Sequence, residues 1–597
     1  MVFKIKEREI KKHLKIKFGY DDFRNGQKVV IENLMKKKDT LAVMPTGSGK
    51  SLCYQLPATL FEGVAIVISP LISLMKDQVD FLNSLNINSA FLNSTLSTEE
   101  LINTEKNLLN GKYKMVYIAP ERFKLKSFKK LFTRLNISML VIDEAHCISH
   151  WGSDFRPSYG EIGNMINCMK NKPVIAAFTA TATQDIRHDI IKSLGMKKTE
   201  IIIQGFDRPN LFFEVVRTKN KDKILLSEIR KLISKHSTQS GIVYTATRND
   251  TEKIKIFLEE NGINTAKYHA GMSPEERIVN QERFINNVSQ IIVATNAFGM
   301  GIDKKDVRLI VHYSMPKDLE SYYQEAGRAG RDGKDSRCVL LFSRKDIVLQ
   351  RFLINNDVKD HDSYYRKNKN LQSMINYCYT SLCLRQYILD YFEDSSSKIR
   401  CDKCTNCASS DSLTDITQEA QKIISCIYRV KEHFGPKTVA KVLNGKTDPL
   451  LEKWDLDKIP TFGMMKEYEE TMILHYIYSL CGNGIIEYSG KRGNRLKLND
   501  TAWKIIKENQ KVFINIFGTD KECGNCLLEN LLKLRNDISA EENVKPFMIL
   551  KRSTIEEIAK YKPVNKESFL KINGIGKIKY GKYGQRFMKV IKEFDKV

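Results

Sequence analysis

The chain has 597 residues, of which 42% are hydrophobic and 28% charged, and its formal net charge is +25. This length exceeds what one hydrophobic core supports, so we expect about three to five domains. No apolar run is long enough to span a bilayer, and residues 1–9 lack the apolar segment of a secretory signal. These features exclude a membrane-embedded protein and predict one that stays inside the cell.

Basic residues outnumber acidic ones. There are 96 lysines and arginines against 71 aspartates and glutamates, an excess that is typical of proteins that bind a polyanion such as nucleic acid. A generally lysine-rich composition would give the same excess, so charge alone does not decide between the two. The 13 cysteines are too scattered for a disulfide framework, with one cluster as the exception.

Short apolar runs separated by helix-length stretches dominate the first 345 residues. In residues 1–205 the runs are 41–43, 64–68, 115–118, 139–142 and 174–178; in residues 206–345 they are 241–244, 290–294, 309–311 and 338–341. Runs of this kind predict parallel strands covered by helices on both faces of a sheet. The sequence therefore predicts two similar α/β lobes, with a nucleotide bound between them.

A glycine-rich segment follows the first apolar run: Met44-Pro45-Thr46-Gly47-Ser48-Gly49-Lys50-Ser51. In such a turn at the start of a helix, backbone N–H groups bind phosphates, the lysine reaches the terminal phosphates and the hydroxyl ligates Mg²⁺. We therefore expect the four residues before Lys50 to surround the phosphates of a nucleotide, Lys50 to contact its β- and γ-phosphates and Ser51 to hold Mg²⁺. Met44 departs from the strict pattern, which has glycine there.

Two adjacent carboxylates, Asp143 and Glu144, follow the apolar run at 139–142. In this place Asp143 would hold Mg²⁺ and Glu144 would activate a water. An isolated acidic pair is more often a solvated loop. Here the pair and the glycine-rich segment each follow an apolar strand, in order, and together they predict an enzyme that hydrolyses a nucleotide.

Further sequence strings surround these motifs in a fixed order. They are 18–27 (FGYDDFRNGQ), 69–78 (SPLISLMKDQ), 178–182 (FTATA), 294–303 (ATNAFGMGID) and 323–333 (YQEAGRAGRDG). Together they closely resemble the RecQ family of superfamily 2 DNA helicases, over nearly the whole chain. The resemblance implies an α/β fold of two RecA-like parallel-sheet lobes (1–205 and 206–345), then a helical zinc-binding module (346–410), a winged helix (411–515) and a small helical domain of the HRDC type (520–597).

Residues 18–27 suit recognition of the adenine base. The amide of Gln27 can donate to and accept from the edge of adenine, and Tyr20 offers a ring for stacking. Arg24 lies in the same string, and we assign all three residues to the nucleotide site. A string such as Phe-Arg-x-x-Gln without the glycine-rich segment downstream would be read as a helix surface.

In the second lobe, Arg328 and Arg331 are three residues apart, which predicts that they share one face of a helix. From there the two guanidinium groups could reach the γ-phosphate across the cleft. Without the other motifs, such a pair would be read as a solvated basic face. By resemblance, Gln324 joins the water network that couples hydrolysis to closure of the lobes.

The loop after the acidic pair contains Trp151, Phe155 and Arg156. Aromatic rings with an arginine suit stacking on unpaired bases, worth about 1–3 kcal/mol per base. The loop resembles the aromatic-rich loop of the family, which relays DNA binding to the ATPase site. Ser153 stands where the family commonly has histidine, and His150 where it often has glutamine, so the relay could be rewired. A hydrophobic plug under a loop is the alternative interpretation.

The cysteine cluster consists of Cys401, Cys404 and Cys407, each separated by two residues. Cys383 upstream could complete a tetrahedral Cys₄ zinc site, and Cys378 competes for this role. The resemblance favours Cys383. Four thiolates leave no open coordination position, so the site would be structural.

The C-terminal third is predicted to bind DNA. Helices are predicted at 418–434 and 436–443, and a hairpin at 484–488 and 495–498. By resemblance this is the winged helix that grips duplex DNA, with Lys491 and Arg492 at the wing tip. Cys523 and Cys526 have no later cysteine to close a second site and are interpreted as part of a linker.

The resemblance implies an ATP-dependent DNA helicase with 3′–5′ polarity, acting in recombination, repair and replication-fork maintenance. Its cofactors would be ATP, Mg²⁺ and Zn²⁺, and its partners single- and double-stranded DNA, with a single-stranded-DNA-binding protein as a further candidate. We expect a monomer at the nucleoid in the cytoplasm of a bacterium, or in the nucleus of a eukaryote. The alternatives are an RNA helicase and a DNA-binding scaffold with a dead ATPase; intact Lys50, Asp143 and Glu144 argue against the scaffold.

Overall fold

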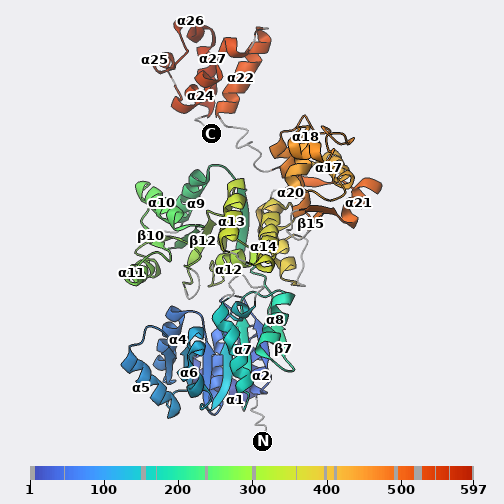
Figure 1. Ribbon diagram of the computed structural model, residues 1–597. Helices are drawn as coiled ribbons and strands as arrows, with labels where there is room; N and C mark the ends of the chain where they lie inside the picture. Colours follow the sequence, from blue (N-terminus) through green and yellow to red (C-terminus); the bar gives the residue numbers. More distant parts are fainter. Residues whose placement is uncertain are drawn as a thin grey trace. The chain divides into compact units, whose positions relative to one another are not determined.

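The computed structural model of the chain (Figure 1) divides into two compact units, Met1–Asn515 and Ile516–Val597. The described residues are 7–45, 47–149, 156–169, 171–235, 239–298, 304–357, 360–394, 400–408, 413–489, 495–516, 527–542, 544, 546–563 and 565–594. Across these ranges, the structure contains no helix with the length and apolar character needed to cross a membrane.

The first lobe, blue to teal in Figure 1, is built on a seven-stranded parallel sheet with the order β3-β4-β2-β5-β6-β1-β7. Its strands are β1 Thr40–Val43, β2 Val64–Ile68, β3 Ser89–Leu92, β4 Met115–Ile118, β5 Ile137–Ile142, β6 Val174–Thr179 and β7 Glu200–Ile203. Its helices are α1 Glu7–Phe18, α2 Gln27–Met35, α3 Lys50–Leu60, α4 Ile72–Ser84, α5 Thr98–Leu109, α6 Lys126–Phe132, α7 Gly160–Cys168 and α8 Gln184–Leu194. Every residue of β1, β2, β4 and β6 is buried, because helices cover both faces of the sheet.

The second lobe is a six-stranded parallel sheet with the order β10-β11-β9-β12-β13-β8. Its strands are β8 Leu211–Arg217, β9 Ser240–Tyr244, β10 Thr265–Tyr268, β11 Ile291–Ala294, β12 Val307–His312 and β13 Ser336–Phe342. Its helices are α9 Lys221–Lys235, α10 Arg248–Glu260, α11 Pro274–Ile285, α12 Leu319–Ala326 and α13 Arg344–Asp357. The prediction of two parallel-sheet lobes is therefore confirmed.

The zinc-binding module follows as α14 His361–Tyr379, α15 Leu384–Tyr391 and the short α16 Thr405–Ala408. The next part contains α17 Thr417–Arg429, α18 Pro436–Asn444, α19 Pro449–Lys453, α20 Glu470–Gly482 and α21 Asp500–Lys507. It also has two antiparallel strand pairs, β14 Leu413–Asp415 with β17 Phe513–Asn515, and the hairpin β15 Ile486–Ser489 with β16 Arg495–Leu498. The predicted helix at 418–434 is too long: α17 ends at Arg429, and Lys431 and Glu432 have left-handed φ values of 53° and 57°.

α20 packs very closely on α14. A Cβ atom at Gly482 would lie 2.8 Å from both Asn376 O and Thr380 N, so only glycine allows this approach. Next to it, the backbone N–H of Ser381 donates to Asn483 Oδ1 at 2.8 Å. The winged helix is thus seated backbone to backbone on the zinc-binding module.

The second unit is a small helical domain around its own core. Its elements are α22 Leu527–Glu541, α23 Pro546–Ile549, α24 Arg552–Tyr561, α25 Lys566–Leu570, α26 Lys577–Lys579, the π-helical turn η5 Tyr580–Gly584 and α27 Gln585–Phe594. The core includes Leu531, Ile558, Phe569, Phe587 and Ile591, all at most 1% exposed.

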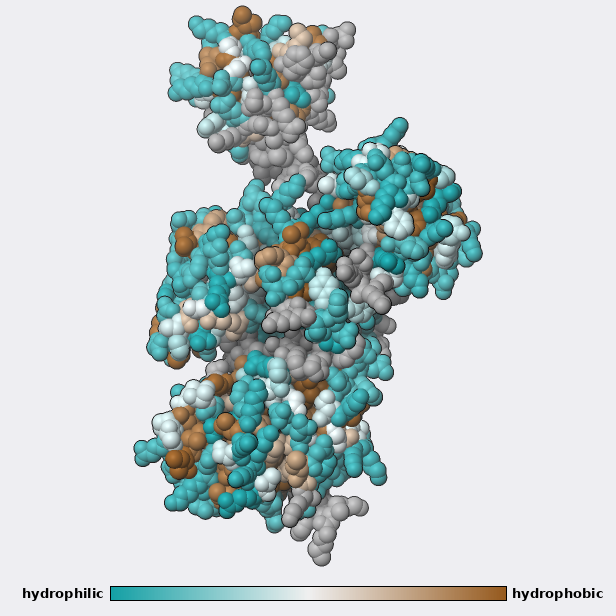
Figure 2. Space-filling view, in the orientation of Figure 1, coloured by the Kyte–Doolittle hydropathy of each residue, from teal (hydrophilic) through white to brown (hydrophobic). Residues whose placement is uncertain are grey.

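The face of the molecule seen in Figure 2 is mainly hydrophilic, with apolar residues scattered over it.

Candidate active site

The predicted catalytic motifs of lobe 1 meet at one edge of its sheet. All strands of the sheet are parallel, so the residues that follow β1, β5 and β6 lie at the same carboxyl edge. The strand order places β6 between β1 and β5. The glycine-rich segment and the acidic pair therefore flank Thr179, whose backbone O accepts a hydrogen bond from Met44 N at 2.9 Å.

The glycine-rich segment turns through two left-handed residues. Gly47 and Gly49 have φ values of 83° and 82°, and α3 begins at Lys50 immediately afterwards. Such a turn directs its N–H groups outward at the start of a helix, which suits a polyphosphate. Thr46 lies outside the described residues; Ser48 and Ser51 belong to the same turn and helix start.

Gln27 and Arg24 hold this segment from the N-terminal side. Gln27 Nε2 donates to Ser48 O at 3.2 Å and to Gly49 O at 3.0 Å, and its Oε1 accepts from Arg24 N at 2.8 Å. Arg24 Nη1 donates to Gly47 O at 3.1 Å. The Gln27 amide is thus engaged with the phosphate-binding turn, while the predicted stacking partner Tyr20 is 47% exposed.

Asp143 is buried and Glu144 half-buried, and both lie near positive charges. Burial and the negative charge of Glu144 raise the pKa of Asp143 to about 7, while Lys50 acts in the opposite direction. Burial also disfavours ionised Glu144, but the positive charges of Lys50, His146 and Arg328 hold its pKa below the usual range. One side chain from the phosphate-binding turn and one from lobe 2 therefore act on the same carboxylate.

Glu144 itself has a left-handed backbone, with φ 48° and ψ 49°. Its Oε2 lies 3.4 Å from His146 Nδ1 and, within the described part of the chain, makes no hydrogen bond although it is buried. A buried carboxylate oxygen of this kind suits a water molecule as its partner. The geometry therefore fits the predicted general base.

Lobe 2 reaches this edge through the segment between α12 and β13, residues 327–335, which we call the arginine turn. The predicted helix face for Arg328 and Arg331 is wrong, because α12 ends at Ala326 and Gly330 has a φ of 56°. The two arginines lie instead in consecutive turns. A Cβ atom at Gly47 would lie 3.5 Å from Arg331 Cγ, so the Arg331 side chain lies against the phosphate-binding turn.

A line of hydrogen bonds joins the acidic motif to lobe 2. His146 Nδ1 lies 3.0 Å from Thr179 Oγ1, which donates to Thr181 O at 3.0 Å. Gln324 Nε2, from α12, donates to Thr181 Oγ1 at 2.9 Å. The predicted residue Gln324 therefore contacts lobe 1 directly. Sequence analysis did not single out the two threonines; their only signal was the string Thr-Ala-Thr after a strand.

The predicted DNA-sensing loop is described only at its end. Trp151 and Phe155, with His150 and Ser153, lie outside the described residues. Arg156 Nη1 donates to Pro70 O, in the turn after β2, at 3.1 Å, and its charge lowers the pKa of Glu144. Lys491 and Arg492 of the wing tip, like Cys523 and Cys526, are also outside the described part.

The four cysteines come together as one cluster. The Sγ atoms of Cys383, Cys401, Cys404 and Cys407 all lie within 4.8 Å of one another. Sγ of Cys404 is 3.9 Å from that of Cys383, which is close to the spacing expected around tetrahedral Zn²⁺ with Zn–S bonds of about 2.3 Å. Cys378 lies in α14 and is not part of this cluster.

Backbone N–H groups support the cluster. Those of Gln386, Lys403 and Cys407 donate to the sulfurs of Cys383, Cys401 and Cys404, each at 3.4 Å. Such bonds stabilise thiolates and orient metal ligands. The donor set and its surroundings therefore fit one structural Zn²⁺.

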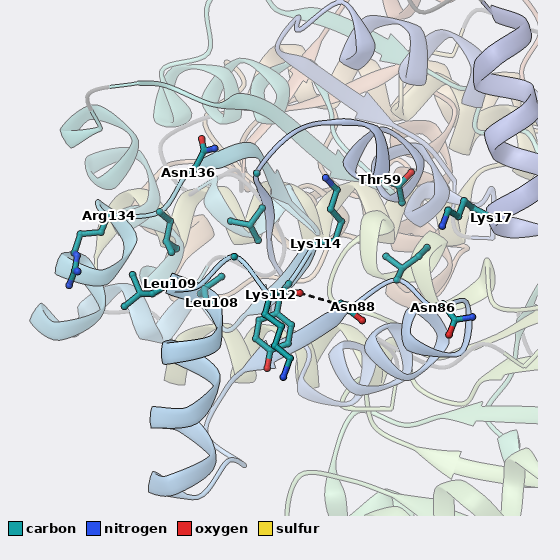
Figure 3. Close-up of a pocket in the computed structure, with 16 residues that line it drawn as sticks. Lys17, Thr59, Asn86, Asn88, Leu108, Leu109, Lys112, Lys114, Arg134 and Asn136 are labelled. Atoms are coloured by element: carbon teal, nitrogen blue, oxygen red, sulfur yellow. Dashed lines mark hydrogen bonds between the residues drawn. The ribbon is translucent and has the colours of Figure 1, made fainter.

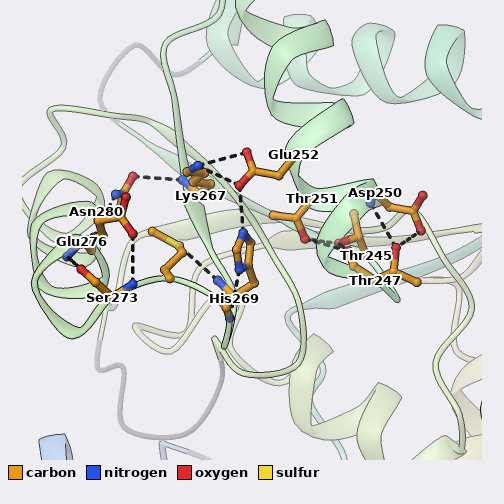
Figure 4. Close-up of polar contacts among 12 residues, drawn as sticks. Thr245, Thr247, Asp250, Thr251, Glu252, Lys267, His269, Ser273, Glu276 and Asn280 are labelled. Carbon is orange, nitrogen blue, oxygen red and sulfur yellow. Dashed lines mark hydrogen bonds and ion pairs between the residues drawn. The ribbon is translucent and has the colours of Figure 1, made fainter.

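A polar network in lobe 2, shown in Figure 4, was not predicted from the sequence. Glu252 Oε1 lies 2.7 Å from Lys267 Nζ and 2.9 Å from His269 Nε2, while Gly271 N donates to His269 Nδ1 at 3.2 Å. The network fixes the turn that follows β10 against α10. Its members come from separate elements, so no single motif indicates it.

A cavity of about 680 Å³ in lobe 1 is not the nucleotide site (Figure 3). Its lining includes Lys112, Lys114 and Asn136, which precede the amino ends of β4 and β5. The phosphate-binding turn and the acidic pair follow the carboxyl ends of their strands. The cavity and the candidate active site therefore lie at opposite edges of the sheet.

Comparison with known proteins agrees with this geometry. Five family models match the chain: DEAD/DEAH box helicase (24–188), helicase conserved C-terminal domain (221–333), RecQ zinc-binding (344–408), RQC domain (410–521) and HRDC domain (525–591). The chain is 41% identical to the ATP-dependent DNA helicase RecQ of Bacillus subtilis, and the match covers 97% of each chain. It is 35% identical to the protein of the same name from Pasteurella multocida, over 97% of this chain and 93% of the relative. Similarity of this degree along nearly the whole length shows that the chain belongs to the RecQ family of ATP-dependent DNA helicases.

Proposed function

We propose that the carboxyl edge of the lobe 1 sheet, completed by α12 and the arginine turn of lobe 2, is the site of ATP hydrolysis in this helicase. The observation that carries the proposal is the contact of lobe 2 with the phosphate-binding turn and with the residues that follow β6. Arg331 lies against Gly47, and Gln324 binds Thr181. A site shared by two lobes can use hydrolysis to change their separation.

The residues divide the chemistry among them. Lys50 neutralises the terminal phosphates, and Arg328 and Arg331 stabilise the charge that develops in the transition state. Ser51 and Asp143 would hold Mg²⁺, which supplies charge neutralisation when bound. Glu144, kept ionised by neighbouring positive charges, takes the proton of the attacking water.

DNA binding is proposed to spread over several parts. Trp151, Phe155 and Arg156 would contact the translocated strand near the acidic pair, and Lys491 and Arg492 the duplex. Closure and reopening of the lobes would then move the enzyme 3′ to 5′ along single-stranded DNA. We further propose domain limits at residues 205, 345, 410, 515 and 520, a monomer, a single-stranded-DNA-binding protein as partner, and action at the nucleoid of a bacterium or in the nucleus of a eukaryote.

Unwinding of tailed duplexes tests the polarity and the substrate. The wild-type protein with ATP and Mg²⁺ should separate a duplex with a 3′ single-stranded tail and leave one with a 5′ tail paired. Lys50→Ala should leave both duplexes paired, because the cation of the phosphate-binding turn is gone. Unwinding from the 5′ tail would overturn the polarity, and faster unwinding of an RNA duplex would favour the RNA helicase.

The role of the arginine turn is tested by Arg331→Ala. We expect ATP hydrolysis at saturating ATP and DNA to fall by about 10³-fold or more, as for other arginine fingers. Binding of a fluorescent ATP analogue should change little. A decrease below tenfold would show that Arg331 is a solvated basic residue.

A further inference from the structure

The arginine turn lacks a helix to hold it in place. α12 ends before it, and the two arginines lie in successive turns. A group that must meet a phosphate needs a fixed position, because displacement by about 1 Å can cost 10²-fold in rate. The contacts that position this turn come from outside it.

Arg208, in the linker between the lobes, makes the first of these contacts. Its Nη1 donates to Gly327 O at 3.1 Å, and its Nη2 donates to Ala329 O at 2.9 Å and Gly330 O at 3.1 Å. One guanidinium therefore binds the carbonyls on both sides of Arg328 and the one just before Arg331. The rigid fork of arginine is suited to this task, and a lysine could not span the three oxygens.

Asn210, two residues further on, holds the C-terminal part of the turn. Its Nδ2 donates to Gly330 O and to Lys334 O, both at 2.9 Å. A Cβ atom at Gly330 would lie 2.4 Å from this nitrogen, so the amide rests directly on the backbone. The arginine turn is thus fastened to residues 208–210 on both sides of Arg331.

The zinc-binding module contacts the same linker. Arg385, 6% exposed at the start of α15, donates through Nη1 to Asp207 Oδ1 and to Arg208 O, both at 2.6 Å. A second nitrogen of Arg385 binds Leu211 O. The zinc-binding module therefore binds the backbone carbonyl of Arg208, while the guanidinium of Arg208 binds the arginine turn.

The cysteine cluster also contacts lobe 2 directly. Lys403, between two of the cysteines, places its Nζ 2.8 Å from Asp335 Oδ1, in the last residue of the arginine turn. Its backbone O accepts from Phe213 N of β8 at 3.2 Å. A folded zinc-binding module therefore contacts both the linker and the turn.

We propose that Arg208 is a positioning residue for ATP hydrolysis: together with Asn210 it holds the arginine turn against the phosphates, and we call these two residues the clamp. The zinc-binding module supports the clamp through Arg385. The inference rests on the proposed role of Arg328 and Arg331. It gives the zinc-binding module a part in the rate of hydrolysis, although its cysteines do not touch the nucleotide.

The test compares Arg208→Gln, Arg208→Lys and Arg337→Gln. Arg337 is a matched control, because it lies in lobe 2 like the arginine turn and its guanidinium binds Glu228, a residue outside the turn, at 2.6 Å. Arg208→Gln should lower kcat by about 10- to 100-fold while the KM for ATP and the affinity for single-stranded DNA change less than about threefold. Arg208→Lys should recover part of the rate, and Arg337→Gln should keep kcat even if its melting temperature falls.

Combining the variants separates positioning from general stability. If Arg208 acts through Arg328 and Arg331, adding Arg208→Gln to the Arg328→Ala/Arg331→Ala variant should slow hydrolysis no further. Multiplied effects would overturn the proposal, as would a wild-type kcat in Arg208→Gln. If Arg331→Ala hydrolyses ATP slowly while Arg208→Gln hydrolyses it at the wild-type rate, the role of Arg208 is rejected and the proposed function stands. A wild-type rate in Arg331→Ala would reject both.

The support from Arg385 is tested with Arg385→Gln in the full-length protein, with bound zinc measured by metal analysis. Protein that retains one zinc per chain should still show a lowered kcat, and combining the change with Arg208→Gln should add nothing further. A zinc-replete Arg385→Gln enzyme with wild-type kcat would overturn the supporting role.

Discussion

At the scale of single residues, unusual backbone conformations mark the candidate site. Gly47, Gly49 and Glu144 all have positive φ values; glycine adopts them freely, whereas for a glutamate this conformation is strained, and strain of this kind occurs at functional sites. The two glycines were predictable, because a phosphate-binding turn needs them. The conformation of Glu144 was not, since nothing in the residue type favours it. The residue types also did not indicate that the Gln27 amide binds the backbone of the phosphate-binding turn; they predicted only that it could bind the edge of adenine.

Replacement of Glu144 tests the general base. Glu144→Gln keeps the size of the side chain but removes its ability to take a proton, so we expect ATP to bind normally and hydrolysis to fall by about 10²- to 10⁴-fold. Nucleotide binding by fluorescence and phosphate release measure the two effects. Glu161→Gln, which removes a half-buried ion pair with Lys129, serves as the control. Near-normal turnover in Glu144→Gln would assign the base elsewhere.

Gly49→Ala tests the close fit of Gln27 on the phosphate-binding turn. The new Cβ atom would lie 2.4 Å from Gln27 Nε2, in addition to the cost of a positive φ, about 1–2 kcal/mol. Gly111→Ala is the matched control, with a φ of 70° and no atom within 4 Å. Both variants should lose thermal stability, but only Gly49→Ala should lose ATP binding. Equal ATP affinity in the two would show that Gln27 is unimportant for the turn.

At the scale of elements, the inner strands were predictable and the edge strands were not. β3, β7, β8 and β10, which sequence analysis missed, are the outermost strands of their sheets. Inner strands are buried on both faces and appear as continuous apolar runs. Edge strands need not be buried on both faces, and the residues of β7 alternate between half-buried and exposed. The helix predicted for Arg328 and Arg331 failed because glycines at 327 and 330 end α12 early.

The zinc-binding module allows a sharp test at this scale. Cys404→Ser removes a ligand, so we expect loss of bound zinc and poor folding, because metal binding supplies folding free energy in small modules. Cys378→Ser changes an equally buried cysteine outside the cluster and should retain one zinc per chain. Metal analysis and thermal unfolding of the purified proteins measure both. Zinc retained in Cys404→Ser but lost in Cys378→Ser would reverse the ligand assignment.

At the scale of the whole molecule, the sequence predicted that Arg328 and Arg331 reach across to lobe 1, but not which hydrogen bonds join the two lobes. Each motif was visible in its own strand-to-helix turn, but Thr181 and Gln324 are 143 positions apart and meet only in the folded chain. The same holds for Arg208 and the arginine turn. Sequence patterns report local structure, whereas these contacts depend on how two separate sheets face each other.

The contact between Thr181 and Gln324 should couple DNA binding to hydrolysis. We expect Gln324→Ala and Thr181→Val each to reduce the stimulation of ATPase activity by single-stranded DNA more than the activity without DNA. Because both changes remove the same hydrogen bond, the double variant should resemble either single one. Additive losses, or unchanged stimulation, would show that the bond does not transmit the signal.

The close approach at Gly482 has a mechanical consequence. Not even a methyl group fits between Gly482 of α20 and the backbone of α14, so the winged helix has no room to slide on the zinc-binding module. Arg217 of β8 joins α14 to lobe 2 by donating to Cys378 O at 2.9 Å. Helix α14 is therefore fastened both to α20, through backbone packing, and to lobe 2, through a hydrogen bond. Any side chain introduced at position 482 would have to push α20 away from the α14 backbone before the chain could reach this fold.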